Sequence, residues 1–380
     1  MLRFERITIR GFKSIEALED LALGKLNVLI GANGAGKSNF VEFFRLLRAI
    51  RHRRLQDYMQ RNAPAEGFFH KGIKQTPRIE ADLSFGEDCD YHFRLVPTPN
   101  LAVSIEKESG RWNGPLGLNP LSGQVMWGGL ESEWWTLGVA SPPMQVFRPG
   151  RPNVLHGRPN APQAPPDWQV YHFHDTSTTA GMRRESGVEQ TDALAPDAGN
   201  LAAFLLHLRE QYPEVYQLLR QTVQRVFPPL DDFDPRTREG KNERLVRLTW
   251  RQKGSDYVFS PGHFSDGTLR FICLATALLQ PNPPATVVFD EPELGLHPEA
   301  LVIFAGLVRS AAARMQIILA TQSPTLLNEF EPDDVITVDY THGATQFNRL
   351  DQVQLRAWLE DYTLGDLWQK GTLRGGVNHA

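Results

Sequence analysis

The chain has 380 residues, of which 41% are hydrophobic and 22% are charged, which is typical of a soluble globular protein and excludes a largely disordered or fibrous one. Its formal net charge of −4 provides no overall attraction to nucleic acid or anionic lipid. The two cysteines, Cys89 and Cys273, are far apart in sequence, which argues against a disulfide framework or a zinc site and fits a reducing compartment.

The N-terminal residues MLRFERITIRGFKS alternate charged and apolar side chains and lack the apolar core of a signal peptide. No uninterrupted apolar run approaches the ~20 residues that span a bilayer. We therefore expect a cytoplasmic protein without a membrane partner.

The first half of the chain contains two kinds of predicted strand. Strands are expected at 4–9 and 26–30, the second leading through a glycine-rich turn into a helix from Lys37 to about Gln60. Residues 78–107 alternate polar and apolar side chains, which predicts an antiparallel meander and a second sheet. Prolines and glycines crowd residues 141–166, where we expect an irregular loop.

The second half alternates helices with short apolar strands. After a strand at 168–173 come a helix at 200–227 that breaks near Pro213 and a strand at 245–250. Helices are then expected at 268–280, 299–314 and 324–329, and strands at 285–290, 316–320 and 335–339. This rhythm is typical of a parallel sheet with crossover helices.

A phosphate-binding motif follows the strand at 26–30. Residues 31–38 read GANGAGKS and fit the pattern G-x-x-x-x-G-K-[ST] between a strand and a helix. Such a loop directs backbone N–H groups and a helix N-terminus at phosphate, while Lys37 reaches the β- and γ-phosphates and Ser38 can ligate Mg²⁺. The alternative is an ordinary glycine-rich turn. The expected ATP contacts in this motif are Gly31, Asn33, Gly34, Gly36, Lys37 and Ser38.

Two further strands end in polar residues. Asp290 and Glu291 follow an apolar strand, where Asp290 suits Mg²⁺ and Glu291 suits the base that takes a proton from the attacking water. Gln322 follows the strand at 316–320 and is placed to sense the γ-phosphate. The alternatives are a solvated acidic strand end and a plain turn before a helix.

A second anion site is expected before the helix at 268–280. The sequence Ser265-Asp266-Gly267 offers a hydroxyl, backbone N–H groups and a helix N-terminus. Because one chain already has its phosphate loop, this site would most simply cap the nucleotide of a second molecule. The alternative is a helix cap without a ligand.

Together these segments resemble the ABC-type ATPase heads of the SMC, RecF and OLD group. The shared segments, in the order of that group, are GFKS (11–14), GANGAGKSN (31–39), FSDGTLR (264–270), VVFDEPELGLHP (287–298) and ATQSP (320–324). SDGTLRF, DEPELGLHP and LGDLWQKG (364–371) are similar to the stand-alone predicted AAA-family ATPases.

The resemblance implies ATP and Mg²⁺ as ligands and a head-to-tail homodimer with ATP between the chains. It implies that Ser265, Asp266 and Gly267 act in trans, and that the D-loop at 293–298 contributes Gly295 and His297. It adds Lys13 and Asn39 to the ATP contacts. Asp266 departs from the glycine usual in this signature, and Gln322 stands where a histidine is common.

The glutamine-loop position is occupied, by order in the chain, by HFHD at 172–175, which makes His174 and Asp175 candidates. His172 and His174 would share one face of their strand and are also candidates for a metal or for structural polar roles.

The predicted fold is α/β, with a P-loop NTPase core of ABC-ATPase type, an added antiparallel lobe, a helical insertion and no long coiled coil. We expect a single head comprising lobe I at 1–140, an insertion at 141–260, lobe II at 261–350, and a C-terminal helix and tail at 351–380.

The predicted function is a dimeric, ATP-hydrolysing switch that regulates an effector protein, in DNA repair or defence against phage. One alternative is a DNA-end or DNA-structure binder. It would use a basic stretch, which could equally be a solvated helix face paired with acids: Arg45, Arg48, Arg51, Arg53 and Arg54. Another alternative is the nucleotide-binding subunit of a transporter.

Overall fold

The computed structural model describes residues 2–62, 64–86, 89–98, 102–112, 167–241 and 243–373. The chain forms two compact units. The first unit comprises residues 1–23, 42–167 and 340–347, and the second comprises residues 24–41, 168–339 and 348–380. Each unit is therefore assembled from segments far apart in sequence. The loop expected at 141–166 lies outside the described residues, and the four-part division of the chain stays a prediction.

The first unit is built on a five-stranded antiparallel sheet of order β2-β1-β4-β5-β6. Its strands are β1 (Arg6–Phe12), β2 (Ile15–Ala22), β4 (Ile79–Ser84), β5 (Cys89–Pro97) and β6 (Val103–Trp112). The meander expected at 78–107 is thereby confirmed. Strand β2 was not expected, because its buried residues Ile15, Leu18 and Leu21 are three apart and hide the period of two. An irregularity in its pairing with β1 between Ile7 and Ile9 accounts for the spacing of Leu18 and Leu21.

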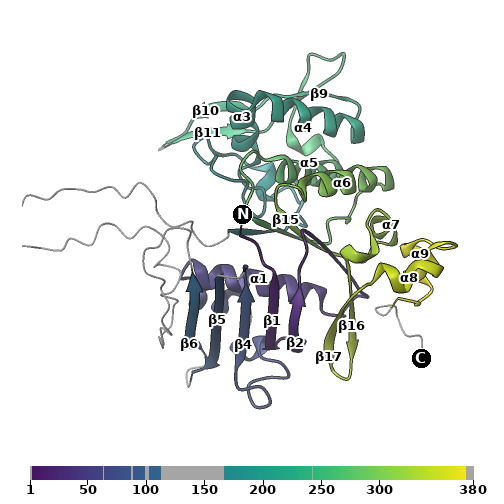
Figure 1. The fold of residues 1–380 in the computed structure, drawn as a ribbon. Helices are drawn as coiled ribbons and strands as arrows, with labels where there is room; N and C mark the ends of the chain where they lie inside the picture. The colour runs from purple at the N-terminus through teal and green to yellow at the C-terminus, as the bar shows by residue number, and fades with distance from the viewer. Residues whose placement is uncertain are drawn as a thin grey trace, which may run out of the picture. The chain divides into compact units, whose positions relative to one another are not determined.

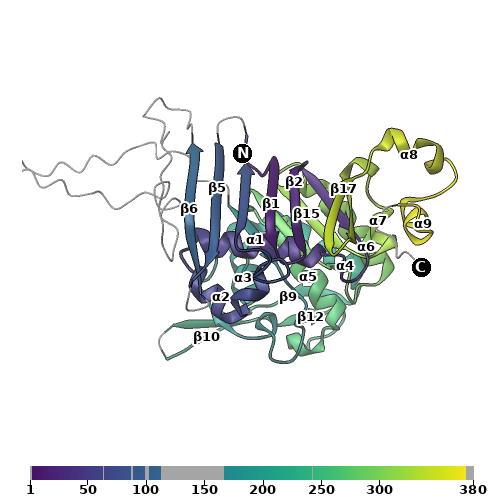
Figure 2. The ribbon, with the colours of Figure 1, turned by 90° about the horizontal axis from the view of Figure 1, so that it is seen from below.

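Helix α1 (Lys37–Arg51) crosses the strands of this sheet on one face (Figure 1 and Figure 2). Aromatic rings hold it there. Phe44 packs edge-on against Phe4, with ring centroids 5.2 Å apart, and Phe43 packs against Phe12 at 5.7 Å. These rings are fully buried, so the apolar face of α1 that carries Phe43 and Phe44 packs in the core of the first unit.

The expectation of one helix from Lys37 to about Gln60 was wrong, because α1 ends at Arg51 and α2 (Leu55–Asn62) begins after a break. Arg53 has a φ of 55°, and its N–H bonds to the carbonyl of Ile50. The N–H of Arg54 reaches back to the carbonyl of Ala49, which completes a Schellman ending. The usual glycine is absent from this ending, so the sequence did not signal it.

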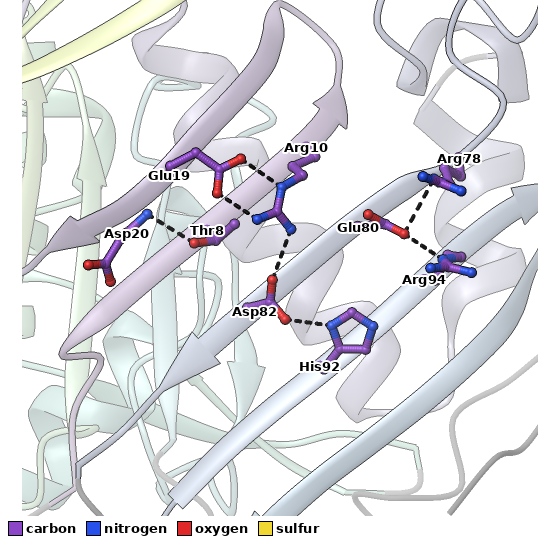
Figure 3. Close-up of polar contacts among 9 residues, drawn as sticks. All are labelled: Thr8, Arg10, Glu19, Asp20, Arg78, Glu80, Asp82, His92 and Arg94. Atoms are coloured by element: carbon purple, nitrogen blue, oxygen red, sulfur yellow. Dashed lines mark hydrogen bonds and ion pairs between the residues drawn. The ribbon is translucent and has the colours of Figure 1, made fainter. Parts of the chain in front are cut away.

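The other face of the antiparallel sheet carries charged side chains joined across the strands (Figure 3). Both carboxylate oxygens of Glu19 accept hydrogen bonds of 2.6 Å from Arg10, whose third nitrogen lies 3.1 Å from Asp82. Asp82 in turn lies 2.6 Å from Nδ1 of His92. Opposite charges thus face each other on neighbouring strands, which stabilises the pairing of a solvated sheet face.

We predict that Asp82→Asn lowers the free energy of unfolding at pH 7 by up to about 1 kcal/mol, because these half-exposed pairs are screened by water. The hydrogen bond from His92 lowers the pKa of Asp82. A lowered pKa stabilises the fold above the ordinary pKa of aspartate, and this contribution is lost as the pH falls through the folded-state value. Urea unfolding should therefore show a difference at pH 7 that shrinks as the pH falls below the ordinary pKa of aspartate. A difference that stays undiminished at acid pH would contradict the assignment.

The second unit contains most of a six-stranded sheet of order β17-β16-β3-β15-β14-β7. Its strands are β3 (Leu26–Ile30), β7 (Trp168–Tyr171), β14 (Thr286–Asp290), β15 (Gln316–Thr321), β16 (Val335–Thr341) and β17 (Ala344–Arg349). The strands from β16 to β7 in this order pair in parallel. All residues of β3, β14 and β15 are buried, as expected for parallel strands covered on both faces.

The helices α3 to α7 of the second unit lie close to their predicted ranges, and two helices, α8 and α9, are present where one C-terminal helix was expected. They are α3 (Leu201–Gln211), α4 (Pro213–Val226), α5 (Asp266–Leu279), α6 (Pro298–Ala311), α7 (Pro324–Leu327), α8 (Gln352–Leu359) and α9 (Leu364–Gln369). The break between α3 and α4 falls before Pro213, as predicted. No helix in the described part of the chain is longer than the 15 residues of α1 or could cross a membrane.

Two small sheets complete the second unit. They have the orders β10-β11-β8 and β13-β12-β9. Their strands are β8 (Ser186–Gly187), β9 (Leu230–Phe233), β10 (Arg236–Glu239), β11 (Arg244–Arg247), β12 (Trp250–Gln252) and β13 (Val258–Phe259). The strand expected at 245–250 is thus two strands in different sheets. The predicted mixed α/β architecture, with parallel and antiparallel sheets, is confirmed.

Candidate nucleotide-binding site

Three parallel strands bring the predicted site residues to one edge of the sheet. Ile30 of β3 pairs with Thr321 of β15, and Ala320 pairs with Asp290 of β14. The residues that follow these strands, among them Gly31, Gln322 and Glu291, therefore emerge side by side at the carboxyl ends, where open α/β sheets bind ligands.

The loop at 31–38 has the backbone that its glycines allow. Gly34 and Gly36 have φ values of 80° and 111°, which side chains disfavour. A Cβ on Gly31 would lie 2.4 Å from the carbonyl oxygen of Val338, so this turn has no room for one. Asn33 and Gly34 are exposed at the tip, and Asn39 is half-buried in the first turn of α1.

Lys37 is the buried cation of this loop. Its side chain folds back so that Nζ donates to the carbonyls of Gly31 at 2.7 Å and Ala32 at 3.1 Å. Burial lowers the pKa of Lys37, while Glu291 and Asp290 oppose this effect. A buried ammonium that donates to neutral carbonyls would be stabilised further by an anion bound at the same place.

Ser38 and Asp290 come together from segments 252 positions apart, with Oγ 3.4 Å from Oδ1. A hydroxyl and a carboxylate oxygen at this separation fit a shared Mg²⁺, which prefers oxygen ligands and retains several waters. The sequence predicted both residues as Mg²⁺ ligands, and that role stays a prediction.

Glu291 has a φ of 44°, which is rare for a residue with a long side chain and costs on the order of 1 kcal/mol. Its N–H bonds to the carbonyl of Ala320 at 2.8 Å, so the parallel ladder continues through this residue and fixes it. Strain held in place by a sheet is common where a side chain must point in one functional direction.

Glu293 was missed as an individual site residue. Its Oε1 accepts hydrogen bonds from the hydroxyl of Thr321 at 2.7 Å and from the N–H of Gln322 at 2.9 Å. Its Oε2 is buried and has no hydrogen-bond partner among the residues that the structure describes, and burial raises the pKa of the carboxyl group. Glu293 thus joins the turn after β14 to the turn after β15. The third acid in DEPE was the available sequence signal.

The segment after β7 lies beside the acidic strand. Nε2 of His174 donates to the backbone oxygen of Asp290 at 2.9 Å, and Asp175 accepts from the N–H of Ser177 at 3.0 Å. The ring centroids of His172 and His174 lie 4.1 Å apart. No group of three His, Cys, Asp or Glu side chains among the described residues could hold a metal, which gives the metal alternative no third ligand.

The signature segment forms a helix N-terminus. Oγ of Ser265 caps α5 by accepting from the N–H of Thr268 at 3.1 Å, which is the geometry of the cap alternative. A Cβ on Gly267 would lie 2.2 Å from the carbonyl of Gly295, so these two glycines pack backbone to backbone within one chain. His297 is exposed and caps α6.

Arg270 of α5 links three of these segments and was also missed. Its guanidinium donates to the carbonyls of Phe173 at 2.9 Å and His174 at 3.1 Å, and to that of Leu294. The signature helix is thereby tied to the segment after β7 and to the turn after β14. Its place in FSDGTLR gave no signal of this role.

The remaining candidates lie in the first unit. Nζ of Lys13 lies 5.2 Å from the ring centroid of Phe68, and burial lowers the pKa of Lys13. Its contact with ATP stays a prediction. In the basic stretch, Arg45 pairs with Glu42 at 2.8 Å and Arg51 with Asp167 at 3.7 Å. These pairs agree with a helix face paired with acids.

The fold and the site define the class of the protein. The chain resembles a crystal structure of SmcHead bound to the C-winged helix domain of ScpA, with a TM-score of 0.55, 13% identity, and coverage of 93% of this chain and 99% of the other. It also resembles an Smc head domain with an extended coiled coil bound to the C-terminal domain of ScpA derived from Pyrococcus furiosus. That comparison has a TM-score of 0.52 and 12% identity, and covers 95% of this chain and 99% of the other. The chain therefore has the fold of an SMC head.

The family follows from the sequence match. The model of the family described as "AAA domain, putative AbiEii toxin, Type IV TA system" matches residues 26–111 and 163–328, and the chain belongs to this family of P-loop ATPases. The DNA replication and repair protein RecF of Pseudomonas putida (strain GB-1) is 24% identical over 195 residues. That match covers 50% of this chain and 45% of RecF, so the chain spans less than half of this relative.

The packing of Gly267 against Gly295 predicts that Gly267→Ala lowers the free energy of unfolding by about 1–3 kcal/mol, because the added methyl group displaces backbone. Gly306, in the middle of α6, is the matched control, since a Cβ there meets nothing within 4 Å. Gly306→Ala should stabilise the protein by about 0.5–1 kcal/mol. Urea unfolding measures both, and equal stability of the two variants would contradict the packing argument.

Proposed function

We propose that the chain binds ATP with Mg²⁺ at residues 31–38 and hydrolyses it. The observation that supports this most strongly is the approach of Ser38 to Asp290 beside the buried ammonium of Lys37. A cation, a hydroxyl and a carboxylate thereby face one loop of backbone N–H groups, which is an arrangement suited to a magnesium-bound triphosphate.

In this proposal Lys37 exchanges its carbonyl partners for the β- and γ-phosphate oxygens, and the loop's N–H groups bind the remaining phosphate charge. Mg²⁺, held by Ser38 and Asp290, would supply further positive charge for the phosphates. Glu291 takes a proton from the attacking water as the water oxygen bonds to the γ-phosphorus. The bond to the β–γ bridging oxygen breaks, and ADP carries away its electron pair. Gln322, whose backbone is fixed by Glu293, orients the water.

We further propose that two chains share each nucleotide. Ser265 is exposed at the N-terminus of α5, where the helix dipole favours an anion. A second chain would present its own γ-phosphate to this end, so that ATP binding closes a homodimer and hydrolysis opens it.

The biological role proposed for this switch is the control of an effector protein, in DNA repair or in defence against phage. Membership of a family described by an AbiEii toxin supports defence, and similarity to RecF supports DNA repair. The ion pairs of Arg45 and Arg51 do not favour the alternative of a DNA binder that uses the basic helix.

We predict that Lys37→Ala weakens ATP binding at least 100-fold while the protein remains folded, because the side chain binds phosphate and contributes little to the apolar core. Calorimetric titration with ATP measures the affinity, and thermal unfolding without nucleotide controls for folding. ATP affinity equal to wild type would remove Lys37 from the proposed site.

We predict that Glu291→Gln binds ATP, hydrolyses it at least 100-fold more slowly and accumulates as an ATP-dependent dimer visible by light scattering. Adding Ser265→Arg should block that dimer.

The sharing of sites is tested by mixing Lys37→Ala with Ser265→Arg, each inactive alone. In a mixed dimer one composite site carries both lesions and the other carries neither, so activity should return in part. No recovery despite heterodimer formation, together with no ATP-dependent dimer of Glu291→Gln, would refute shared sites.

A further inference from the structure

Asp266 departs from the signature expected at its position, and the structure gives it a partner. The carboxylate of Asp266, the first residue of α5, lies 2.8 Å from Nη2 of Arg183. The side chain of Arg183 is only 8% exposed, whereas that of Asp266 is 66% exposed. The guanidinium of a buried arginine therefore contacts an exposed carboxylate at the N-terminus of the signature helix.

Arg183 is held on all sides of its guanidinium. Nε donates to the carbonyl of Thr176 at 2.8 Å, and Nη1 donates to the carbonyl of Pro261 at 2.5 Å. The backbone of Arg183 itself lies in a short 3-10 turn, Gly181–Arg183. One side chain thus joins the loop after β7, the turn before Ser265 and the first residue of α5.

These contacts continue a path into the site. His174, two residues before Thr176, donates to the backbone of Asp290 and accepts from Arg270 of α5. The loop after β7 is therefore tied to the acidic strand through His174 and to the signature helix through Arg270 and Asp266. Loss of the Arg183 contact would leave this loop tied to α5 by Arg270 and by the Cys273 thiol, which lies 3.8 Å from Sδ of Met182, both beyond the first turn of the helix.

We propose that Arg183 and Asp266 are a positioning pair, which holds Ser265 at the place where it meets the nucleotide of a second chain. Asp266 forms this ion pair within its own chain, whereas the glycine that is usual at this position has no side chain to form one. Asp266 also adds a negative charge to the first turn of α5, which the helix dipole favours, and Arg183 offsets that charge toward an approaching phosphate. For its functional part this inference rests on the proposed shared site. The ion pair of Arg183 with Asp266, called the clamp below, is present in the free chain.

The clamp is tested first without nucleotide. Asp266→Asn changes one exposed group and should leave the fold intact, while Arg183→Ala removes the buried partner. Hydrogen exchange should become at least threefold faster in peptides covering 174–184 and 265–270 in both variants. Arg238, whose side chain is exposed, pairs with Glu185 in the same unit, and Arg238→Ala is the matched control that should leave these peptides unchanged. Unchanged exchange in Arg183→Ala would overturn the proposal.

The functional part is tested in the Glu291→Gln background by light scattering and ATP calorimetry. Asp266→Asn and Arg183→Ala should each weaken the ATP-dependent dimer about tenfold, with ATP affinity of the single chain changed less than twofold. The double variant should be no weaker than either single one, because one interaction is lost in all three.

The outcomes separate the two proposals. If Glu291→Gln itself forms no dimer with ATP, the shared site fails, and hydrogen exchange alone decides on the clamp. If the parent dimerises and the two single effects multiply in the double variant, Arg183 and Asp266 act independently and the positioning pair is refuted.

Discussion

The register of three parallel strands is the constraint on which the second unit depends. Because β15 pairs continuously with β3 on one side and with β14 on the other, Leu29, Ala320 and Asp290 lie at one level of the sheet. A shift by one residue would turn Asp290 into the core and an apolar neighbour toward the loop, since side chains alternate between the two faces of a strand. The complete burial of all three strands makes such a shift costly, so the same contacts that stabilise the core also fix the position of the acids.

Polar groups around this edge are satisfied mainly by backbone. Lys37 and Arg270 are bound by carbonyl oxygens, His174 by the carbonyl of Asp290, and Glu293 by one N–H and one hydroxyl. Backbone partners fix a charged side chain without neutralising it. The site therefore keeps its charge for a ligand while its segments stay connected, which is the kind of preorganisation that phosphate transfer requires.

The two glycines at the signature illustrate how packing and function can select the same residue. Gly267 is required within its own chain by the carbonyl of Gly295, so its presence alone is no argument for a phosphate contact in a second chain. Asp266 supports a different conclusion. Its side chain is exposed and pairs with a specific cationic partner, Arg183. The residue that departs from the expected pattern is therefore the more informative of the two.

The sequence by itself determined the strand and loop at 26–38 with the start of the helix that follows, the acidic strand end at Asp290, and the alternation of helices with parallel strands, because each depends on local periodicity and on residues adjacent in the chain. Only the tertiary structure decided the strand β2, the ending of α1 at Arg51 before the left-handed Arg53, and the contacts of Glu293, Arg270 and Arg183. The first two depend on a bulge and on a left-handed arginine that carry no composition signal. Apart from the local contact of Arg183 with Thr176, these side chains contact residues 24 to 97 positions away, and such pairs are set by how the segments pack and not by either segment alone.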